Sequence, residues 1–360
     1  MKRFFLSFLL VVLASVPVRG EELLTVHEWG TITTQHLDSG EQSGGLNRIR
    51  EDELLPPFVH VFDTDFLIEF TKRAAPIPGA SWGHKSVNMR LETPVIYFYP
   101  APGFDLSTPI DVTVEFKGGL INEYFPEAKP EYENIETSEK GETNITKGTV
   151  GKITWSGVTL AGEAQGPATD SSIWLAPREV KSNAVHLPNG ESEQYLFYRG
   201  VAHLDSLLRT KHTLDTRVVS IYAPGDLPAY LANTILSKVW VTSVNTDGLA
   251  AFKEIGSLSL SADPAEPLAS VSVDFKKEDY SAENLDRLKK DMRQELVNKG
   301  LFEEEAAAML KTWDKAYFGN PGVRIFFIVP QEWVNAHLPL KFSVPVQLER
   351  VIIGRIDLVM

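Results

Sequence analysis

The sequence of 360 residues contains no cysteine. This absence excludes disulfide bonds, cysteine-ligated zinc, iron–sulfur clusters and thiol nucleophiles together. The chain also lacks a run of basic residues. In total, 35 Lys and Arg stand against 48 Asp and Glu, which gives a net charge of −13 at pH 7. Nucleic-acid phosphates are neutralised by basic surfaces, so the acidic balance argues against nucleic acid as a partner.

Motifs that carry nucleophilic or cofactor chemistry are missing as well. The sequence has no G-x-S-x-G, no S-x-x-K, no P-loop and no G-x-G-x-x-G that follows a strand. The sequence therefore contains no motif that indicates an acyl-transfer, nucleotide-dependent or dinucleotide-dependent enzyme. No organic cofactor is expected. A divalent metal is the cofactor that the sequence leaves open.

Long apolar runs occur at one place, the N-terminus. Lys2 and Arg3 precede an apolar stretch over 4–12, and Gly20 suits cleavage before residue 21. This is the three-part layout of a secretory signal peptide, assigned here to residues 1–20. A spanning helix needs about 20 apolar residues, more than this run provides. We therefore expect a mature region, 21–360, that is periplasmic or extracellular, has no transmembrane segment and carries 32 basic against 48 acidic residues, a net charge of −16.

Short strands with turn signals between them fill the stretch from about 95 to 275. Apolar and polar residues alternate over 111–116, and Gly118-Gly119 separates this segment from 120–125, which predicts a β-hairpin. Asn189-Gly190 and Asp247-Gly248 predict two further hairpins. Strands at this spacing favour antiparallel sheets packed as a sandwich or an open barrel.

The hydrophobic period changes near residue 281. Apolar residues recur every three or four positions from Leu285 to Leu296, as on one face of a helix. Ser281 suits the N-cap, and Gly300 lies just past the C-terminal end. A second helix is predicted to turn apolar residues inward over 306–317. Together these segments predict a helical hairpin near residues 281–318.

The fold class predicted from these patterns is α+β and mostly β, with antiparallel sandwich-like sheets and the helical hairpin as an insertion. Strand-like segments at 323–329 and 346–358 follow the helices, so the hairpin is expected to pack on the sheet. Residues 21–360 are predicted to fold as one β-rich region or as two coupled subdomains, about 21–200 and 201–360.

Potential metal ligands are densest near the start of the mature region. Four of the eight histidines fall between positions 27 and 84. Neutral imidazole and carboxylate are the usual ligands of zinc, manganese or iron, so the candidate ligands are His27, His60, Asp63, Asp65 and His84. The spacings match no established metal motif, since position 31 is Thr where H-E-x-x-H requires its second His. The alternative is a set of polar loop residues with one or two buried histidines.

Three arginines are candidates for ligand binding. Arg90 and Glu92 share one face of an extended segment, where they either form an anion site or pair to fix the strand register. Arg178 and Arg199 each follow aromatic residues. Arginine beside aromatic rings binds sugars or carboxylates in many proteins, although the same pattern is produced by alternating core and surface positions of a strand.

Four stretches resemble a set of secreted bacterial proteins with a VHEWGT-type N-terminal motif. They are 25–31 (TVHEWGT), 89–95 (MRLETPV), 196–200 (LFYRG) and the helical segment 300–313. These proteins have no assigned activity, so the resemblance implies no catalytic role. It implies a bacterial envelope location and draws attention to His27, Glu28, Arg90, Glu92 and Arg199.

The leading functional prediction is an exported, soluble envelope protein that binds a ligand or a protein partner. The alternative is a metal-dependent hydrolase that uses the His and Asp candidates, with Glu28 or Glu92 as general base on a metal-bound water. The hydrolase requires three of those side chains to converge beside an open pocket. A third interpretation, a structural component of an envelope assembly, fits the same observations.

Overall fold

The computed structural model describes residues 24–46, 55–62, 85–137, 143–213, 215–260 and 263–360. The predicted signal peptide and the candidate ligands Asp63, Asp65 and His84 lie outside these described residues. No helix in the described ranges is long and apolar enough to cross a membrane.

The strands are β1 (Leu24–His36), β2 (His60–Val61), β3 (Met89–Pro100), β4 (Ile110–Lys117), β5 (Gly119–Phe125), β6 (Lys129–Glu133), β7 (Glu136–Thr137), β8 (Thr143–Asn144), β9 (Val150–Val158), β10 (Val185–His186), β11 (Ser192–Glu193), β12 (Leu196–Ala202), β13 (Arg209–Thr213), β14 (Val218–Tyr222), β15 (Ile235–Leu236), β16 (Val239–Val244), β17 (Ala250–Ile255), β18 (Leu258–Ser259), β19 (Ala269–Ser272), β20 (Gly322–Ile328), β21 (Leu340–Phe342) and β22 (Gln347–Leu358). The helices are α2 (Ser172–Leu175), α3 (Ala282–Asn298), α4 (Glu303–Thr312) and α5 (Gln331–His337). Short helical turns are η2 (Pro177–Glu179), η3 (Ala229–Leu231), η4 (Lys277–Asp279) and the π-helical η5 (Lys315–Gly319).

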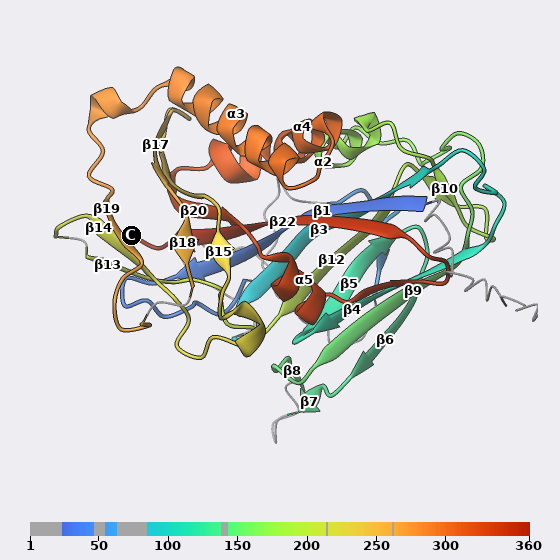
Figure 1. The fold of residues 1–360 in the computed structure, drawn as a ribbon, viewed down its shortest axis with the longest axis horizontal. Helices are drawn as coiled ribbons and strands as arrows, with labels where there is room; N and C mark the ends of the chain where they lie inside the picture. The colour runs from blue at the N-terminus through green and yellow to red at the C-terminus, as the bar shows by residue number, and fades with distance from the viewer. Residues whose placement is uncertain (1–23, 47–54, 63–84, 138–142, 214, 261–262) are drawn as a thin grey trace, which may run out of the picture.

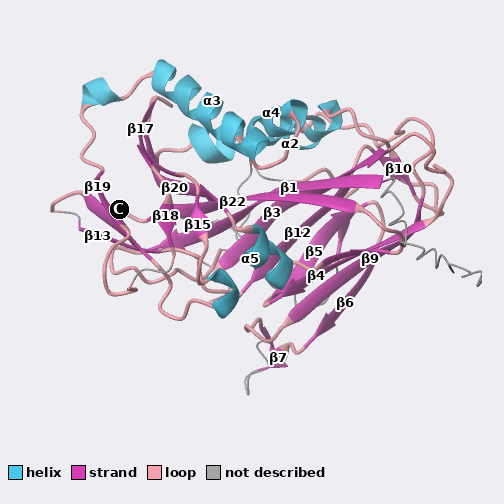
Figure 2. Cartoon of the chain, in the orientation of Figure 1, coloured by secondary structure: helices cyan, strands magenta, loops and turns pink. Residues whose placement is uncertain are grey.

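One mixed sheet of 13 strands dominates the fold (Figures 1 and 2). Its order is β17-β16-β20-β22-β1-β3-β12-β5-β9-β4-β21, with β2 beside β5 and β6 beside β9. The fold is therefore mostly β, as predicted. The sheet is mixed and not purely antiparallel, because β1 and β22 run parallel over 12 residue pairs. The first and last strands described thus lie side by side at the centre of the sheet.

The two faces of the sheet bury different apolar clusters. Side chains alternate along β1, so Val26 and Ile32 face one cluster and Trp29 faces the other. The helical pair α3 and α4 covers the Trp29 face, as Figure 1 shows above the sheet. The opposite face packs against α5 and the small sheets. Because both faces of the sheet are covered, nearly every residue of β1 is buried.

The sheet also curls back on itself. Phe342 of β21 contacts Phe98 of β3 with ring centroids 6.3 Å apart, although β21 lies five positions beyond β3 in the strand order. Glycines allow the curved strands to approach closely: a Cβ on Gly200 would lie 2.5 Å from the Leu120 carbonyl oxygen. The curl gives the β-rich half two facing layers within one continuous sheet.

The helical hairpin forms where the sequence predicts it. The Ser281 hydroxyl accepts a hydrogen bond of 3.1 Å from the Asn284 N–H at the start of α3. Leu288, Met292 and Leu296 are buried on its inner face. The N-terminus of α4 is closed by Glu305, whose carboxylate accepts the Phe302 N–H at 2.7 Å.

One of the three predicted hairpins is confirmed in full and a second in part, because the strand predicted over 194–198 (β12) pairs with β3 and β5 and not with β10. The turn at Asp247-Gly248 joins β16 to β17, and the turn at Asn189-Gly190 joins the short pair β10 and β11. The hairpin predicted across Gly118-Gly119 is wrong. β4 pairs with β9 and β21, whereas β5 pairs with β12. The Gly118 N–H donates to Thr149 C=O, and its C=O accepts from His203 N–H, so this turn is held by other segments.

Candidate functional site

A cavity of about 440 Å³ lies beyond the end of β20. This volume falls in the range of small-molecule and peptide-residue pockets. Its walls come from four places in the chain: the η3–β15 segment, the C-terminal end of α3, the turn from β20 into α5, and β22. The lining residues are Ala229, Tyr230, Asn233, Thr234, Ile235, Leu236, Ser237, Lys299, Ile328, Val329, Pro330, Gln331, Glu332 and Arg350.

The cavity exists because β22 is longer than its neighbour β20. β20 pairs with β22 only as far as Ile328, which lies opposite Ile353. Pro330 then has an extended backbone and leads into α5. β22 nevertheless extends back to Gln347 beside β1. Residues 347–351 therefore form a local edge of the sheet on the side that β20 leaves.

Main-chain groups along β22 point alternately to its two neighbours. Val329 N–H donates to Ile352 C=O on the β20 side, at 2.8 Å, whereas Val359 N–H donates to His36 C=O on the β1 side, at 3.0 Å. Even-numbered residues of β22 consequently direct their N–H and C=O toward β20. Within the described ranges, no hydrogen bond engages the main chain of Leu348 or Arg350 on that side.

The exposure of Arg350 agrees with this arrangement. The residue is 4% exposed while its side chain is 0% exposed, so the accessible part is main chain. The cavity therefore meets the backbone of Arg350, and its guanidinium lies in the protein interior. Main-chain donors and acceptors at a cavity wall provide directional binding groups that any amide can match.

Among the described residues that line the cavity, Lys299 is the one with an exposed cationic side chain. Lys299 follows α3, and its side chain is 38% exposed. Its ammonium lies 4.0 Å from the Glu295 carboxylate, at the limit of an ion pair, and that carboxylate oxygen also accepts from Ser237 Oγ at 2.6 Å. The ammonium is therefore available to a ligand. Glu332 is the one acidic residue among the described residues that line the cavity.

Two exposed apolar side chains line the same cavity. Ile235 is 62% exposed and Tyr230 is 44% exposed, whereas most large apolar residues of the described chain are buried. Partial burial raises the pKa of Tyr230, so the phenol is neutral at physiological pH. Its hydroxyl lies 3.4 Å from His337 Nε2 of α5. Apolar surface beside an exposed cation suits a ligand that has both an apolar and an anionic part.

A buried polar network supports the cavity wall from inside. Arg350 Nε donates to Glu28 Oε2 at 2.6 Å, and Tyr198 donates to Glu28 Oε1 at 2.6 Å. Arg350 Nη1 also donates to Leu338 C=O at 2.7 Å and to Asn335 of α5 at 3.2 Å. Burial, followed by the charge of Glu28, raises the pKa of Tyr198 far above its ordinary value. The candidate catalytic residue Glu28 is therefore a fully engaged interior carboxylate.

The structure does not bring His27 and His60 together. His27 lies on the helix-covered face, where its Nδ1 is 2.8 Å from Glu305 of α4. His60 Nε2 is 2.8 Å from Glu191, in the loop between β10 and β11. Within the described ranges, no group of three His, Asp or Glu side chains has the arrangement of a metal site. The proposed ligands Asp63, Asp65 and His84 lie outside those ranges.

The three candidate arginines are engaged with carboxylates. Arg90 pairs with the buried Glu92, and Arg199 Nη1 lies 3.4 Å from Glu123 across the β12–β5 pair. Both pairs lie on the face that carries His27 and Trp29. Arg324, Arg355 and Asp357 lie on the same face of β20 and β22. This face is thus rich in buried, mutually interacting charges.

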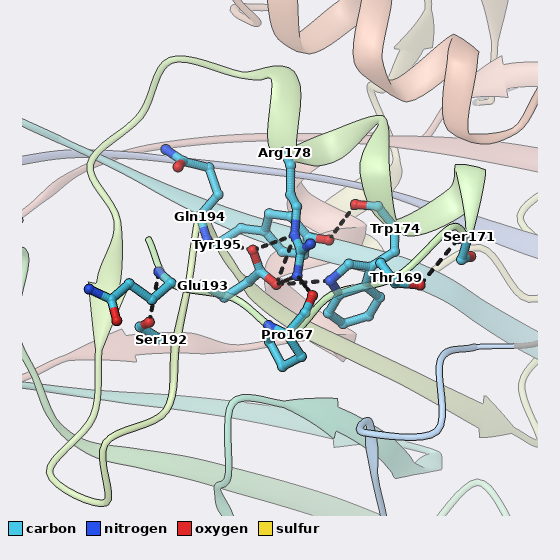
Figure 3. A network of polar contacts seen from close by, with 10 residues as sticks. Pro167, Thr169, Ser171, Trp174, Arg178, Ser192, Glu193, Gln194 and Tyr195 are labelled. Atoms are coloured by element: carbon cyan, nitrogen blue, oxygen red, sulfur yellow. Dashed lines mark hydrogen bonds and ion pairs between the residues drawn. The ribbon is translucent and has the colours of Figure 1, made fainter. Parts of the chain in front are cut away.

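Arg178 belongs to the network drawn in Figure 3. Its guanidinium forms a fork on Glu193, with Nε at 2.9 Å from one oxygen and Nη2 at 2.6 Å from the other. Trp174 Nε1 donates to the same carboxylate at 2.8 Å. The Gln194 main-chain N–H also donates to the Glu193 carboxylate, at 2.8 Å. Glu193 is fully buried and saturated with donors, so the geometry here is that of a structural anchor for the 167–195 segment.

The cavity residues Tyr230, Ile235 and Lys299 have no sequence signal that marks them. Each is a single residue in an irregular segment, and the three are brought together by the long-range pairing of β20 and β22. A partial signal exists in the lengths of the two last strand-like segments, since 346–358 is nearly twice as long as 323–329. Unequal neighbouring strands produce an edge, although the sequence does not show that the two are neighbours.

Comparison with known proteins gives little. No family model matches the chain, and no curated protein matches it. Among solved structures, the chain is similar to the yeast delta-COP-I mu-homology domain, with 10% sequence identity, a TM-score of 0.27, and coverage of 93% of this chain and 95% of that one. A structural similarity this low does not indicate a function for this chain.

Proposed function

We propose that the chain is a non-catalytic binding protein whose ligand occupies the cavity beside β22. The observation that carries the proposal is the coincidence, in one cavity, of the available Lys299 ammonium, the exposed side chains of Tyr230 and Ile235, and unpaired strand main chain. Pockets that bind ligands combine apolar walls with a few directed polar groups, as this one does.

The ion pairs elsewhere support placing the binding function at this cavity. Arg178 saturates Glu193, and Arg90 and Arg199 pair with Glu92 and Glu123. Separating any of these buried pairs would expose an uncompensated charge to the protein interior, which costs about 3–5 kcal/mol. A ligand would have to overcome that cost at each pair, whereas the Lys299 ammonium is already accessible.

The place of action is part of the proposal. We propose that residues 1–20 direct export and that the acidic mature region works in the bacterial envelope, as the leader and the resemblance of the 25–31 stretch suggest. We also regard the curled sheet with its covering elements as a distorted sandwich into which the hairpin near 281–318 is inserted. Membership of the VHEWGT-type set stays a prediction.

The metal-dependent hydrolase stays an untested alternative. His27 and His60 each have a separate carboxylate partner, Glu305 and Glu191, and this favours structural roles for both. Elemental mass spectrometry of the purified protein and of the His27→Ala, His60→Ala variant tests the alternative. Stoichiometric metal that is lost in the variant would support it.

The absence of cysteine allows a direct test of the binding proposal. Ile235→Cys places a single thiol at the rim of the cavity for an environment-sensitive dye. Tyr132→Cys on β6 is the matched control, because Tyr132 is 46% exposed and does not line the cavity. Both proteins are titrated with pools of small organic acids, amphipathic acids and short peptides.

We expect at least one pool to give a saturable response from the dye at 235 and none from the dye at 132. Lys299→Gln should weaken the response about fivefold to tenfold, the effect of losing one partly solvated charge-assisted hydrogen bond. Lys299→Arg should retain most of the affinity. A dye at 235 that responds to no pool would contradict the proposal.

A further inference from the structure

We infer that the ligand is an extended peptide segment with an acidic residue, which adds to the unpaired edge of β22 as a further strand. The inference rests on the proposed function, because it assumes that the cavity is the binding site. Three features of the cavity indicate the class of ligand: the strand edge, the position of the cation and the position of the apolar side chains.

The strand edge selects an extended main chain. Leu348 and Arg350 present two N–H donors and two C=O acceptors toward the space that β20 leaves at Ile328. Extended peptides satisfy such groups by β-strand addition. A helical ligand could not, because its own main-chain groups are already bonded internally.

The dimensions fit a short segment. The edge covers residues 347–351, so it is about 16 Å long at the rise of a β-strand. The cavity of about 440 Å³ meets this edge at Arg350, the one residue of 347–351 among the described residues that line it. Natural proteins cover or charge an exposed strand edge to prevent unwanted pairing. An edge that opens into a cavity, with walls on both sides, restricts pairing to a segment that fits between those walls.

The side-chain preference follows from the two walls. Lys299 directly follows α3, which lies on the helix-covered face of the sheet. Tyr230 lies next to His337 of α5 on the opposite face. Successive side chains of an added strand point to opposite faces. One position of the peptide would therefore meet the Lys299 ammonium, and a neighbouring position would meet the Tyr230 ring. This arrangement favours an acidic residue adjacent to an apolar or aromatic one.

The experiment uses acetylated, amidated hexapeptide pools with the dye at 235 in the mature chain. After the strongest peptide is identified, three analogues are compared with it. Two are N-methylated at one or the other set of alternate amides, and the third has its acidic residue replaced by lysine. N-methylation removes donors and blocks strand pairing while the side chains remain. Lys299→Glu is tested with the acidic and the lysine peptides.

We expect at least a tenfold loss of affinity for one of the two N-methylated analogues, the one whose methylated amides face β22, and for the lysine analogue. We also expect Lys299→Glu to reverse the preference between the acidic and the lysine peptide, a readout that general loss of stability would not produce. Binding that is insensitive to N-methylation, or a charge preference that Lys299→Glu leaves unchanged, would overturn the inference. If organic-acid pools bind and no peptide does, the inference fails while the proposed function stands. If neither binds, both fail.

Discussion

At the scale of single residues, the Glu28 carboxylate of β1 connects three strands of the central sheet. It is fully buried and accepts hydrogen bonds from Tyr198 and Arg350, which lie on two different strands. Removing charges from water is costly, so the pair is stable only while both partners and their other hydrogen bonds are present. The network stabilises the central strands and also holds Arg350, whose main chain lines the cavity.

Truncation of either side chain should destabilise the protein to different degrees. We expect Glu28→Ala to lower the free energy of unfolding by about 3–5 kcal/mol, because the Arg350 guanidinium is left buried without its counter-charge. Tyr198→Phe should lower it by about 1.5–3 kcal/mol, the contribution of one hydrogen bond to a charged group. Urea unfolding of the two variants measures both values, and a smaller loss for Glu28→Ala than for Tyr198→Phe would contradict this assignment.

A second residue-scale prediction concerns His36. Burial, and then the nearby His212, lower the pKa of His36 from 6.5 to about 4 in the folded chain. The unfolded chain takes up a proton on this residue as the pH falls below 6.5, while the folded chain does not until about pH 4. The folded state is therefore destabilised over that window by about 1.4 kcal/mol per pH unit, or about 3 kcal/mol in total.

The pH dependence of unfolding checks the role of His36. Urea unfolding at several pH values between 7 and 4 should show a steeper loss of stability for the wild-type chain than for His36→Gln. The difference between the two curves isolates His36 from the carboxylates that titrate in the same range. Parallel curves would show that His36 does not contribute as described.

At the scale of secondary-structure elements, close approach between strands sets the curvature of the sheet. A Cβ on Gly200 of β12 would meet the Leu120 carbonyl oxygen of β5 at 2.5 Å and the Phe116 ring at 3.0 Å. The main chain cannot withdraw without breaking the β12–β5 ladder. Glycine at this position is therefore required by space and not by backbone conformation.

We expect Gly200→Ala to lower the free energy of unfolding by at least 1–3 kcal/mol, the usual range for overpacking. Gly256→Ala is the matched control, because no atom lies within 4 Å of the Cβ it would add. Thermal unfolding of both variants measures the difference. Equal melting temperatures for the two would rule out the close approach.

The helical elements are attached to the sheet through one carboxylate. Glu305 accepts from the Phe302 N–H at the start of α4 and from the Tyr99 hydroxyl at 2.8 Å, and it lies 2.8 Å from His27. The same side chain thus caps a helix and joins it to β1 and β3. The 25–31 and 300–313 stretches of the resemblance meet at this point.

At the scale of the whole molecule, the sheet combines both parts of the chain. β22 lies beside β1, and β21 lies beside β4 at the far edge. Strands from 201–360 thus border the strands from 21–200 at two places. The division into two coupled subdomains near residue 200 stays a prediction, and the pairing indicates that any coupling is strong.

Calorimetry of the mature chain tests this coupling. We expect one transition in which the calorimetric and van't Hoff enthalpies agree, because separating the two parts would break the 12-residue β1–β22 pairing. Two transitions that are well separated in temperature would show that the parts unfold independently.

The sequence predicts local features of this fold better than its pairings. The Ser281 cap, the apolar face of α3 and the β16–β17 hairpin depend on neighbouring residues, and all three are confirmed. The hairpin at Gly118-Gly119 is wrong because a glycine turn does not specify which strands will pair beyond it. The sequence pattern does not indicate α5, since in its seven residues only Trp333 and Val334 are buried.

The candidate site is also difficult to predict, because it depends on contacts between segments that are far apart in the sequence. Arg90 with Glu92 could be read as a pair, because strand periodicity places them on one face. The partners of Glu28 and His27 are Arg350 and Glu305, about 300 positions away in sequence, and no local pattern reveals them. The cavity depends on β20 ending earlier than the strand beside it, which is a property of tertiary pairing.

Residue-resolved hydrogen exchange along β22 tests the central claim most directly. In the free protein, the Leu348 and Arg350 amides should exchange rapidly while the Glu349 and Val351 amides, which face β1, exchange slowly. Addition of a bound peptide should slow exchange at Leu348 and Arg350 and leave their neighbours unchanged. An Arg350 amide as protected as that of Val351 in the free protein would show that the edge is already paired, and would contradict the account.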